Sequence, residues 1–168
     1  MNNKLIEYKD YYRAIEDSSQ AIQLEPDNAA AFYRRAVAYR DLGQPLRALQ
    51  DLNRVITLSP DKEAAFYQRA VIYDTLGKPL RALQDLNRVI ELRPRYAAAF
   101  YNRGVIYGTL GETLRAIEEY DRAIELDPDY ALPFNNRGNC YFDLLQPERG
   151  LKHLRRAREL KLDKSLPF

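Results

Sequence analysis

The chain is poor in the residues that usually build catalytic and covalent sites. Its 168 residues include one cysteine and one histidine. A single cysteine excludes a disulfide within the chain. A single histidine, His153, excludes a catalytic pair or a metal cluster made of histidines. No glycine-rich phosphate loop is present, and the acidic residues lie mostly beside lysines and arginines, as on a solvated surface. We therefore expect a protein that is not an enzyme and has no cofactor and no metal site.

A strong net charge and a long apolar run are also missing. The 26 Lys and Arg side chains nearly balance the 24 Asp and Glu side chains, which leaves a net charge of +2. Such a chain has no net field that attracts nucleic acid or a membrane surface. No apolar run approaches the length of a membrane span, and the N-terminal residues are not a signal peptide. We expect a soluble, cytoplasmic protein with no nucleic-acid partner and no membrane partner.

What the sequence does contain is a repeat of fixed length. Four copies follow one another at 29–62, 63–96, 97–130 and 131–164. Residues 45–56 recur unchanged as residues 79–90. A fixed period of about 34 residues indicates a stack of supersecondary units, none of which can bury its apolar face alone. Residues 1–28 are then a truncated repeat and 165–168 a short tail, so that 1–168 form a single array.

Six positions of the repeat keep one kind of residue. They are a bulky residue (Phe32, Phe66, Phe100, Phe134), a small residue (Ala36, Ala70, Gly104, Gly138), a tyrosine (Tyr39, Tyr73, Tyr107, Tyr141), a glycine (Gly43, Gly77, Gly111), an alanine (Ala14, Ala48, Ala82, Ala116, with Gly150 last) and a closing proline (Pro26, Pro60, Pro94, Pro128). The glycine suits the end of a first helix, because a positive φ is free only without a Cβ. The closing proline stops a second helix. This pattern resembles the tetratricopeptide repeat family over nearly the whole chain.

The resemblance implies an all-α fold, a right-handed superhelical solenoid of antiparallel helix-turn-helix repeats. Each repeat then has a first helix, helix A, and a second helix, helix B. The function expected of such an array is a non-catalytic protein–protein interaction module that binds a peptide or partner segment in its concave groove. One alternative is a structural unit that stacks through uncapped ends into an end-to-end homo-oligomer. Another is a regulatory fragment of a larger protein.

The resemblance also implies a candidate site, because the A helices of tetratricopeptide arrays line the concave surface. The slot after the bulky residue, and those one and four residues further along, face that surface. The predicted peptide-binding groove consists of Tyr33, Arg34, Val37, Tyr67, Gln68, Val71, Tyr101, Asn102, Val105, Asn135, Asn136 and Asn139. Tyrosines supply contact area and a hydroxyl, and an asparagine amide can match a peptide backbone as donor and acceptor. We expect these tyrosine rings to lie outside the core. A generic solvated face is the alternative.

An arginine occupies one slot of helix A that is often apolar in the family. Its copies are Arg35, Arg69, Arg103 and Arg137, and an acid recurs with the same period on helix B as Asp17, Asp51, Asp85 and Glu119. Because burying a lone charge is costly, we expect an internal ion-pair ladder that joins each arginine to an acid of helix B in the same or the preceding repeat. Binding of acidic ligands by arginines that point into the groove is the alternative. Arg137 is the expected exception, since His153 occupies the place of its acid. Cys140 stands where other repeats have Ala38, Ile72 and Ile106, so we expect a buried thiol.

The two ends depart from the pattern. Counting back from Pro26, Met1 falls in the middle of a helix A, either because the chain was cut from a longer array or because it starts with a half-formed unit. At the other end, Leu162 replaces the closing proline and Leu145 the glycine. Solenoids usually finish with a polar cap, and no full capping helix follows here. We expect the ends to associate through exposed apolar residues near Leu5, Ile6, Leu151 and Leu154.

Overall fold

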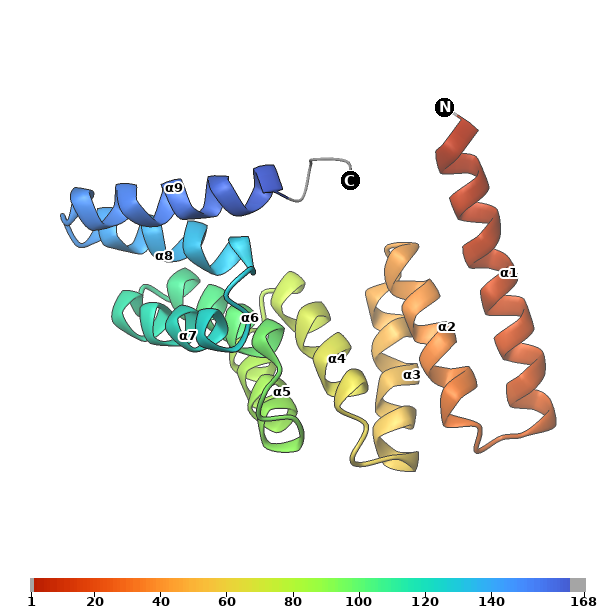
Figure 1. Ribbon diagram of the computed structural model, residues 1–168. Coiled ribbons are helices and arrows are strands. Elements are labelled where there is room, and N and C mark those ends of the chain that lie inside the picture. Colours follow the sequence, from red (N-terminus) through yellow and green to blue (C-terminus); the bar gives the residue numbers. More distant parts are fainter. Residues whose placement is uncertain (1, 164–168) are drawn as a thin grey trace. The chain divides into compact units, whose positions relative to one another are not determined.

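The computed structural model describes residues 2–163, with side chains from residue 8 to residue 161. Every regular element in this range is an α-helix, which confirms the all-α prediction (Figure 1). The helices are α1 (Asn2–Leu24), α2 (Ala29–Asp41), α3 (Pro45–Leu58), α4 (Glu63–Thr75), α5 (Pro79–Leu92), α6 (Ala97–Thr109), α7 (Thr113–Leu126), α8 (Ala131–Asp143) and α9 (Pro147–Asp163). From α2 onward the helix starts recur with the period of the sequence, so α2, α4, α6 and α8 are A helices and α3, α5, α7 and α9 are B helices.

Turn residues explain where the A helices end. Gly43, Gly77 and Gly111 follow helix A with φ of 69°, 66° and 77°. These angles lie in the left-handed region, which costs a residue without a Cβ little. Leu145 takes the glycine position after α8 and keeps the same conformation, with φ of 58°. Three of the B helices then begin with proline, whose missing N–H is no loss at the first helical position.

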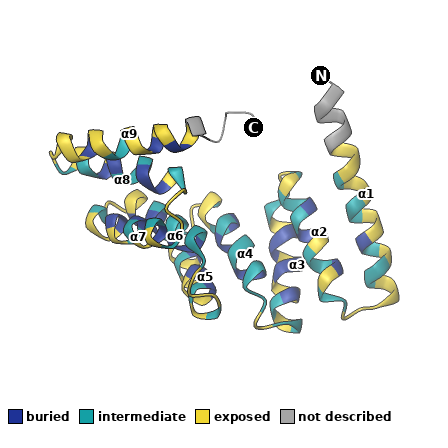
Figure 2. Ribbon diagram, in the orientation of Figure 1, coloured by how far each residue is buried: buried dark blue, intermediate teal, exposed yellow. Residues whose placement is uncertain are grey.

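The chain divides into two compact units, Met1–Arg88 and Val89–Phe168, with the boundary inside α5. In unit 1, α2 packs against α3, and Ala36, Ala48, Leu52 and Val55 belong to one buried cluster. In unit 2, α6 packs against α7 and α8 against α9. Figure 2 shows buried and exposed residues alternating along each helix, as expected where one face of a short helix packs. Helices of 13 or 14 residues are too short to be stable alone, so this packing holds them.

The predicted ion-pair ladder between helices A and B is confirmed. The Nε and Nη2 atoms of Arg35 donate to the two carboxylate oxygens of Asp51, both at 2.8 Å. Arg69 makes the same paired contact with Asp85, at 2.8 and 2.7 Å. Arg103 contacts Glu119 at 2.8 Å between Nη2 and Oε1. Asp51 and Asp85 are buried, and two parallel hydrogen bonds to arginine satisfy a buried carboxylate well.

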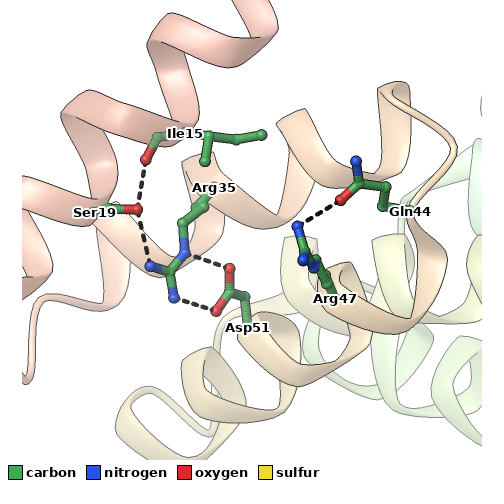
Figure 3. Close-up of polar contacts among 6 residues, drawn as sticks. All are labelled: Ile15, Ser19, Arg35, Gln44, Arg47 and Asp51. Atoms are coloured by element: carbon green, nitrogen blue, oxygen red, sulfur yellow. Dashed lines mark hydrogen bonds and ion pairs between the residues drawn. The ribbon is translucent and has the colours of Figure 1, made fainter.

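In unit 1, the third nitrogen of two ladder arginines reaches the preceding B helix, a contact that the sequence analysis missed. Arg35 Nη1 donates to Ser19 Oγ at 3.1 Å, so this arginine joins α1, α2 and α3 (Figure 3). Arg69 Nη1 donates to Asn53 Oδ1 at 2.7 Å and joins α3, α4 and α5. Ser19 and Asn53 stand one period apart, so in both repeats the arginine connects the helix pair to the helix before it.

The expectation that Arg137 lacks an acid is wrong. Its Nη1 donates to Asp121 Oδ1 on α7, in the slot that Asn53 takes on α3, and its Nη2 lies 3.1 Å from His153 Nδ1. The acid has moved from the following B helix to the preceding one. A carboxylate on either neighbour can balance the guanidinium, because all three helices meet at that side chain.

Glu119 fits the ladder less well than the aspartates do. Its side chain is one methylene longer, and its Oε2 is buried without a hydrogen-bond partner. Burial raises the pKa of the Glu119 carboxyl, against the lowering effect of Arg103. The position thus carries an ion pair in which one carboxylate oxygen is not satisfied.

We predict that Glu119→Asp stabilises the protein, because an aspartate in this slot makes two bonds at Asp51 and Asp85. One added hydrogen bond is worth about 0.5–1.5 kcal/mol in the free energy of unfolding, measured by urea denaturation. Asp85→Glu is the matched control and should lose a similar amount. A Glu119→Asp variant less stable than the parent would contradict this account.

The N-terminal end differs from the sequence-based expectation. Among the described residues, α1 is one continuous helix from Asn2 to Leu24, so no turn separates a helix A from the first helix B. Residues 11–24 correspond to 45–58 of α3, and Lys9 stands where Gly43 turns. Without glycine or proline at this place, the helix simply continues. The side chains of Leu5 and Ile6 lie outside the described residues.

At the C-terminal end, the expected exposure of Leu151 is confirmed. Its side chain is 49% exposed, whereas Leu49 and Ile117 in the same slot are 9% and 8% exposed. Leu154 is half-buried.

Candidate peptide-binding surface

The predicted groove residues come from the four A helices. Three lie on each of α2 and α4, in unit 1, and on each of α6 and α8, in unit 2. Arg34 and Asn139 are exposed, and the other ten are half-buried. None belongs to the fully buried core, so in every case part of the residue remains accessible.

In unit 1 the half-surface on α2 and α4 is held together by a polar contact between the two helices. Arg40 Nη1 donates to Gln68 Oε1, and Arg40 Nε donates to Asp41 Oδ1 at 2.8 Å. The Lys62 ammonium lies 5.4 Å from the centre of the Tyr33 ring, within the range of a cation–π interaction. The Tyr33 ring also packs against the buried cluster of α2 and α3. Tyr33 thus packs against the core without being one of its buried residues, as expected of a ring outside the core.

In unit 2 the half-surface on α6 and α8 contains a small network. Asn136 Nδ2 donates to Tyr101 Oη at 3.3 Å, and the Tyr101 ring centre lies 6.0 Å from Tyr120 and 5.2 Å from Tyr130. Burial raises the pKa of Tyr101 and raises the pKa of Tyr120 to about 12. Tyr101 is therefore half-buried and packed against its unit, but it is not one of the buried core residues. These contacts fix the direction of the Asn136 amide.

Tyr120 is a residue of this network that the sequence analysis did not single out. It is buried on α7, in the slot that Leu52, Leu86 and Leu154 take in other repeats. Gly104 makes room for it, because a Cβ at Gly104 would lie 2.7 Å from Tyr120 Cε1. The signal was present in the sequence as a paired change, leucine to tyrosine and alanine to glycine within one repeat.

Cys140 and His153 are the residues that could carry reactive chemistry. Cys140 is buried as expected, and burial raises the pKa of its thiol, which disfavours the nucleophilic thiolate. His153 stacks on Tyr141 with ring centres 5.2 Å apart. Because arginine can only donate, the contact with Arg137 requires that His153 Nδ1 accepts, as in the neutral ring. Burial, and next the charge of Arg137, lower the pKa of His153.

Two further properties concern the part of the chain that the structure describes. Within it, no three His, Cys, Asp or Glu side chains are grouped so that they could hold a metal ion. Among the same residues, no helix has both the length and the apolar character needed to span a bilayer.

We predict that His153 titrates below 6.5 in the folded protein, as a single imidazole resonance in NMR spectra recorded against pH. The folded state then binds this proton more weakly than the unfolded state does. The free energy of unfolding should therefore be fully maintained above pH 6.5 and fall as the pH drops below it. In His153→Gln this contribution to the pH dependence should be absent. A folded pKa above the ordinary value for histidine would contradict the neutral-ring assignment.

Comparison with known proteins identifies the repeat. Two family models described as tetratricopeptide repeat match residues 19–50 and 67–131, together more than half of the chain. No curated protein sequence matches significantly.

Solved structures agree with these models. The crystal structure of MamA is similar with a TM-score of 0.87 and 24% identity, over 98% of this chain and 96% of that chain. MamA residues 41 to the end from Desulfovibrio magneticus RS-1 give 0.80 and 20%, over 95% and 98%. YrrB, described as a protein with an unusual peptide-binding site, gives 0.76 and 24%, over 96% and 83%. These similarities confirm the predicted fold, an all-helical tetratricopeptide solenoid.

Proposed function

The chain belongs to the tetratricopeptide repeat family, and from this premise we propose that it is a non-catalytic protein-interaction module. It holds a peptide or a segment of a partner protein on the exposed face of its A helices. The near-neutral net charge favours a protein partner over nucleic acid or a membrane surface.

The observation that carries the proposal is the repeated partial exposure of aromatic and apolar side chains on the A helices. Tyr33 and Val37 on α2 are half-buried, and so are Tyr67 and Val71, one period later on α4. Folding has used part of each side chain and left the remainder accessible. A tyrosine already held by its own unit loses little conformational freedom on binding, so it is a good anchor for a ligand.

Unit 2 carries polar binding groups of its own. The Asn136 amide is oriented by Tyr101, and Asn139 is exposed one turn further along α8. An amide can donate to a peptide carbonyl and accept from a peptide N–H whatever the ligand's side chains are. We propose that Asn135, Asn136 and Asn139 contact the ligand backbone. The peptide-binding site named for YrrB supports this by analogy of fold.

We predict that Tyr67→Ala weakens binding of peptides selected from a random library on the parent protein. The loss of an anchor should cost about 1–3 kcal/mol in the binding free energy measured by titration calorimetry. Tyr12→Ala is the matched control, because Tyr12 lies on α1 and is 60% exposed. Equal affinity of both variants for every selected peptide would contradict the proposed surface.

End-to-end self-assembly is the second candidate function, and the exposure of Leu151 favours it. Against it stand Arg155, Arg158 and Lys161 on α9, in slots where α3 has Asn53, Ile56 and Ser59. These charges make α9 a polar end, as in a capping helix. The second alternative, a regulatory part of a larger protein, stays an untested prediction.

Sedimentation at two protein concentrations tests self-assembly. If the ends associate, the mean mass should rise with concentration, and Leu151→Lys should abolish the rise, because a lysine cannot be buried unpaired at the contact. A mass that is independent of concentration would leave the interaction module as the only candidate of the two.

A further inference from the structure

A second surface lies on α1, and Arg34 is the predicted groove residue that takes part in it. A hollow of about 370 Å³ opens there between α1 and the start of α2. Its walls include Ala14, Asp17, Ser18 and Ala21 from α1, and Ala30 and Arg34 from α2. Four of these six side chains are small, so the hollow has room beside the backbone of α1.

The period of the sequence shows what this face of a B helix normally contacts. Ala14, Asp17, Ser18 and Ala21 correspond to Ala48, Asp51, Leu52 and Val55 of α3. All four of those residues are buried, and Ala36 of helix A lies in the same cluster as the three apolar ones. Within the described part of unit 1, by contrast, α1 packs only against α2. The hollow therefore lies where a helix A packs in the complete pairs, and we call it the helix A seat.

The acid at this seat lacks the close arginine contact that it makes in other repeats. Asp17 occupies the slot in which Asp51 and Asp85 each bind an arginine of helix A through two hydrogen bonds. The Asp17 side chain is 70% exposed, and its carboxylate lies 3.9 Å from Nε of the exposed Arg13. Such an exposed pair contributes little, so Asp17 is available for a closer arginine.

Steric pairing in the other repeats indicates the residue next to that arginine. The residue after the ladder arginine is small in the other repeats. Ala36 shares a buried cluster with Leu52, Gly104 lies against Tyr120, and Gly138 lies against Leu154. Ser18 is buried, but it is smaller than these B-helix residues, so it leaves room in the hollow for a side chain larger than alanine.

Arg34 indicates a third feature of the ligand. Its counterpart Gln68 accepts a hydrogen bond from Arg40, which lies five residues after the ladder arginine of the preceding helix A. Arginine in place of Gln68 can only donate, so an acid fits the corresponding position of a helix seated on α1. Asp74, five residues after Arg69, is such an acid within this chain.

We propose that this face of α1 binds an amphipathic helix of a partner protein, in the position that helix A holds in the complete pairs. That helix carries an arginine for Asp17, a residue larger than alanine directly after it, and an acid five residues after the arginine. A second copy of the chain is a poorer occupant. Its own A helices are packed in their pairs, with Ala36 and Ala70 buried, and offering one would expose this core.

A labelled peptide with the sequence of residues 63–76 tests the proposal, because it contains Arg69 and Asp74 at the required spacing. The peptide carries Ala70→Leu to match Ser18. Fluorescence anisotropy with the complete chain should show saturable binding below about 1 mM, since a short helix must first be ordered. The same peptide with its natural alanine should bind more weakly.

The Asp17 contact is tested by paired substitutions. Asp17→Asn in the protein should weaken binding of the leucine peptide about tenfold, as loss of a charge-assisted pair does. Arg69→Met in the peptide should weaken it to the same extent, and the two changes together should cost no more than either alone. Asp10→Asn, at another exposed acid of α1, should leave the affinity unchanged. Circular dichroism checks that each variant is folded.

Three results would overturn the proposal: no binding at millimolar peptide, equal affinity of the Asp17→Asn and Asp10→Asn variants, or a free chain that is a dimer dissociated by the peptide. The last would make a second copy the occupant. The outcome is separable from the proposed function. Tyr67→Ala in the complete chain should leave its affinity for the leucine peptide unchanged. Peptides selected for the A-helix surface should bind the Asp17→Asn chain as tightly as they bind the parent chain.

Discussion

The pairing of one half-buried arginine per repeat is the interaction on which the rest of the structure depends. A guanidinium inside a helix pair needs a carboxylate, and the planar fork of arginine accepts few geometries. Arg35 satisfies this with Asp51 on its own helix B and with Ser19 on the preceding B helix. The same contact that closes one helix pair thus connects it to its neighbour. An apolar residue in this slot could pack the pair, but it would not specify the angle or register of the next helix.

Variation along the ladder shows which part of this constraint is strict. Glu119 keeps the charge and leaves one oxygen unsatisfied, while at Arg137 the acid is Asp121 and the former acid position holds neutral His153. The charge of the guanidinium is balanced each time, although the helix that balances it changes. The apolar contacts between helices are adjusted in a similar way, since the missing Cβ of Gly104 leaves the space that the Tyr120 ring occupies. Both are local solutions to packing against two neighbours at once.

The two proposed surfaces follow from what the ladder leaves uncovered. Packing of helix A on helix B consumes one face of each, so the A helices keep a partly exposed row of tyrosine, valine and polar side chains. On α1 the situation is reversed, because a face made for helix A remains open with Asp17 on it. The first surface offers contact area and amides for an extended or short ligand. The second offers a shaped, charged seat for a helix, so the two select different partner chemistries.

The sequence by itself determined the period, the helix pairs, the pairing of Arg35, Arg69 and Arg103 with acids of B helices, and the burial of Cys140. These depend on residues within one repeat, where the fixed period places each side chain at a known slot. Only the tertiary structure decided that Asp121 pairs with Arg137, that Asn136 and Tyr120 surround Tyr101, and that α1 is unbroken with an open face. Contacts between successive repeats depend on how the pairs stack. That stacking depends on how the side chains of several helices fit together in space, and this fit cannot be read from any one position of the repeat.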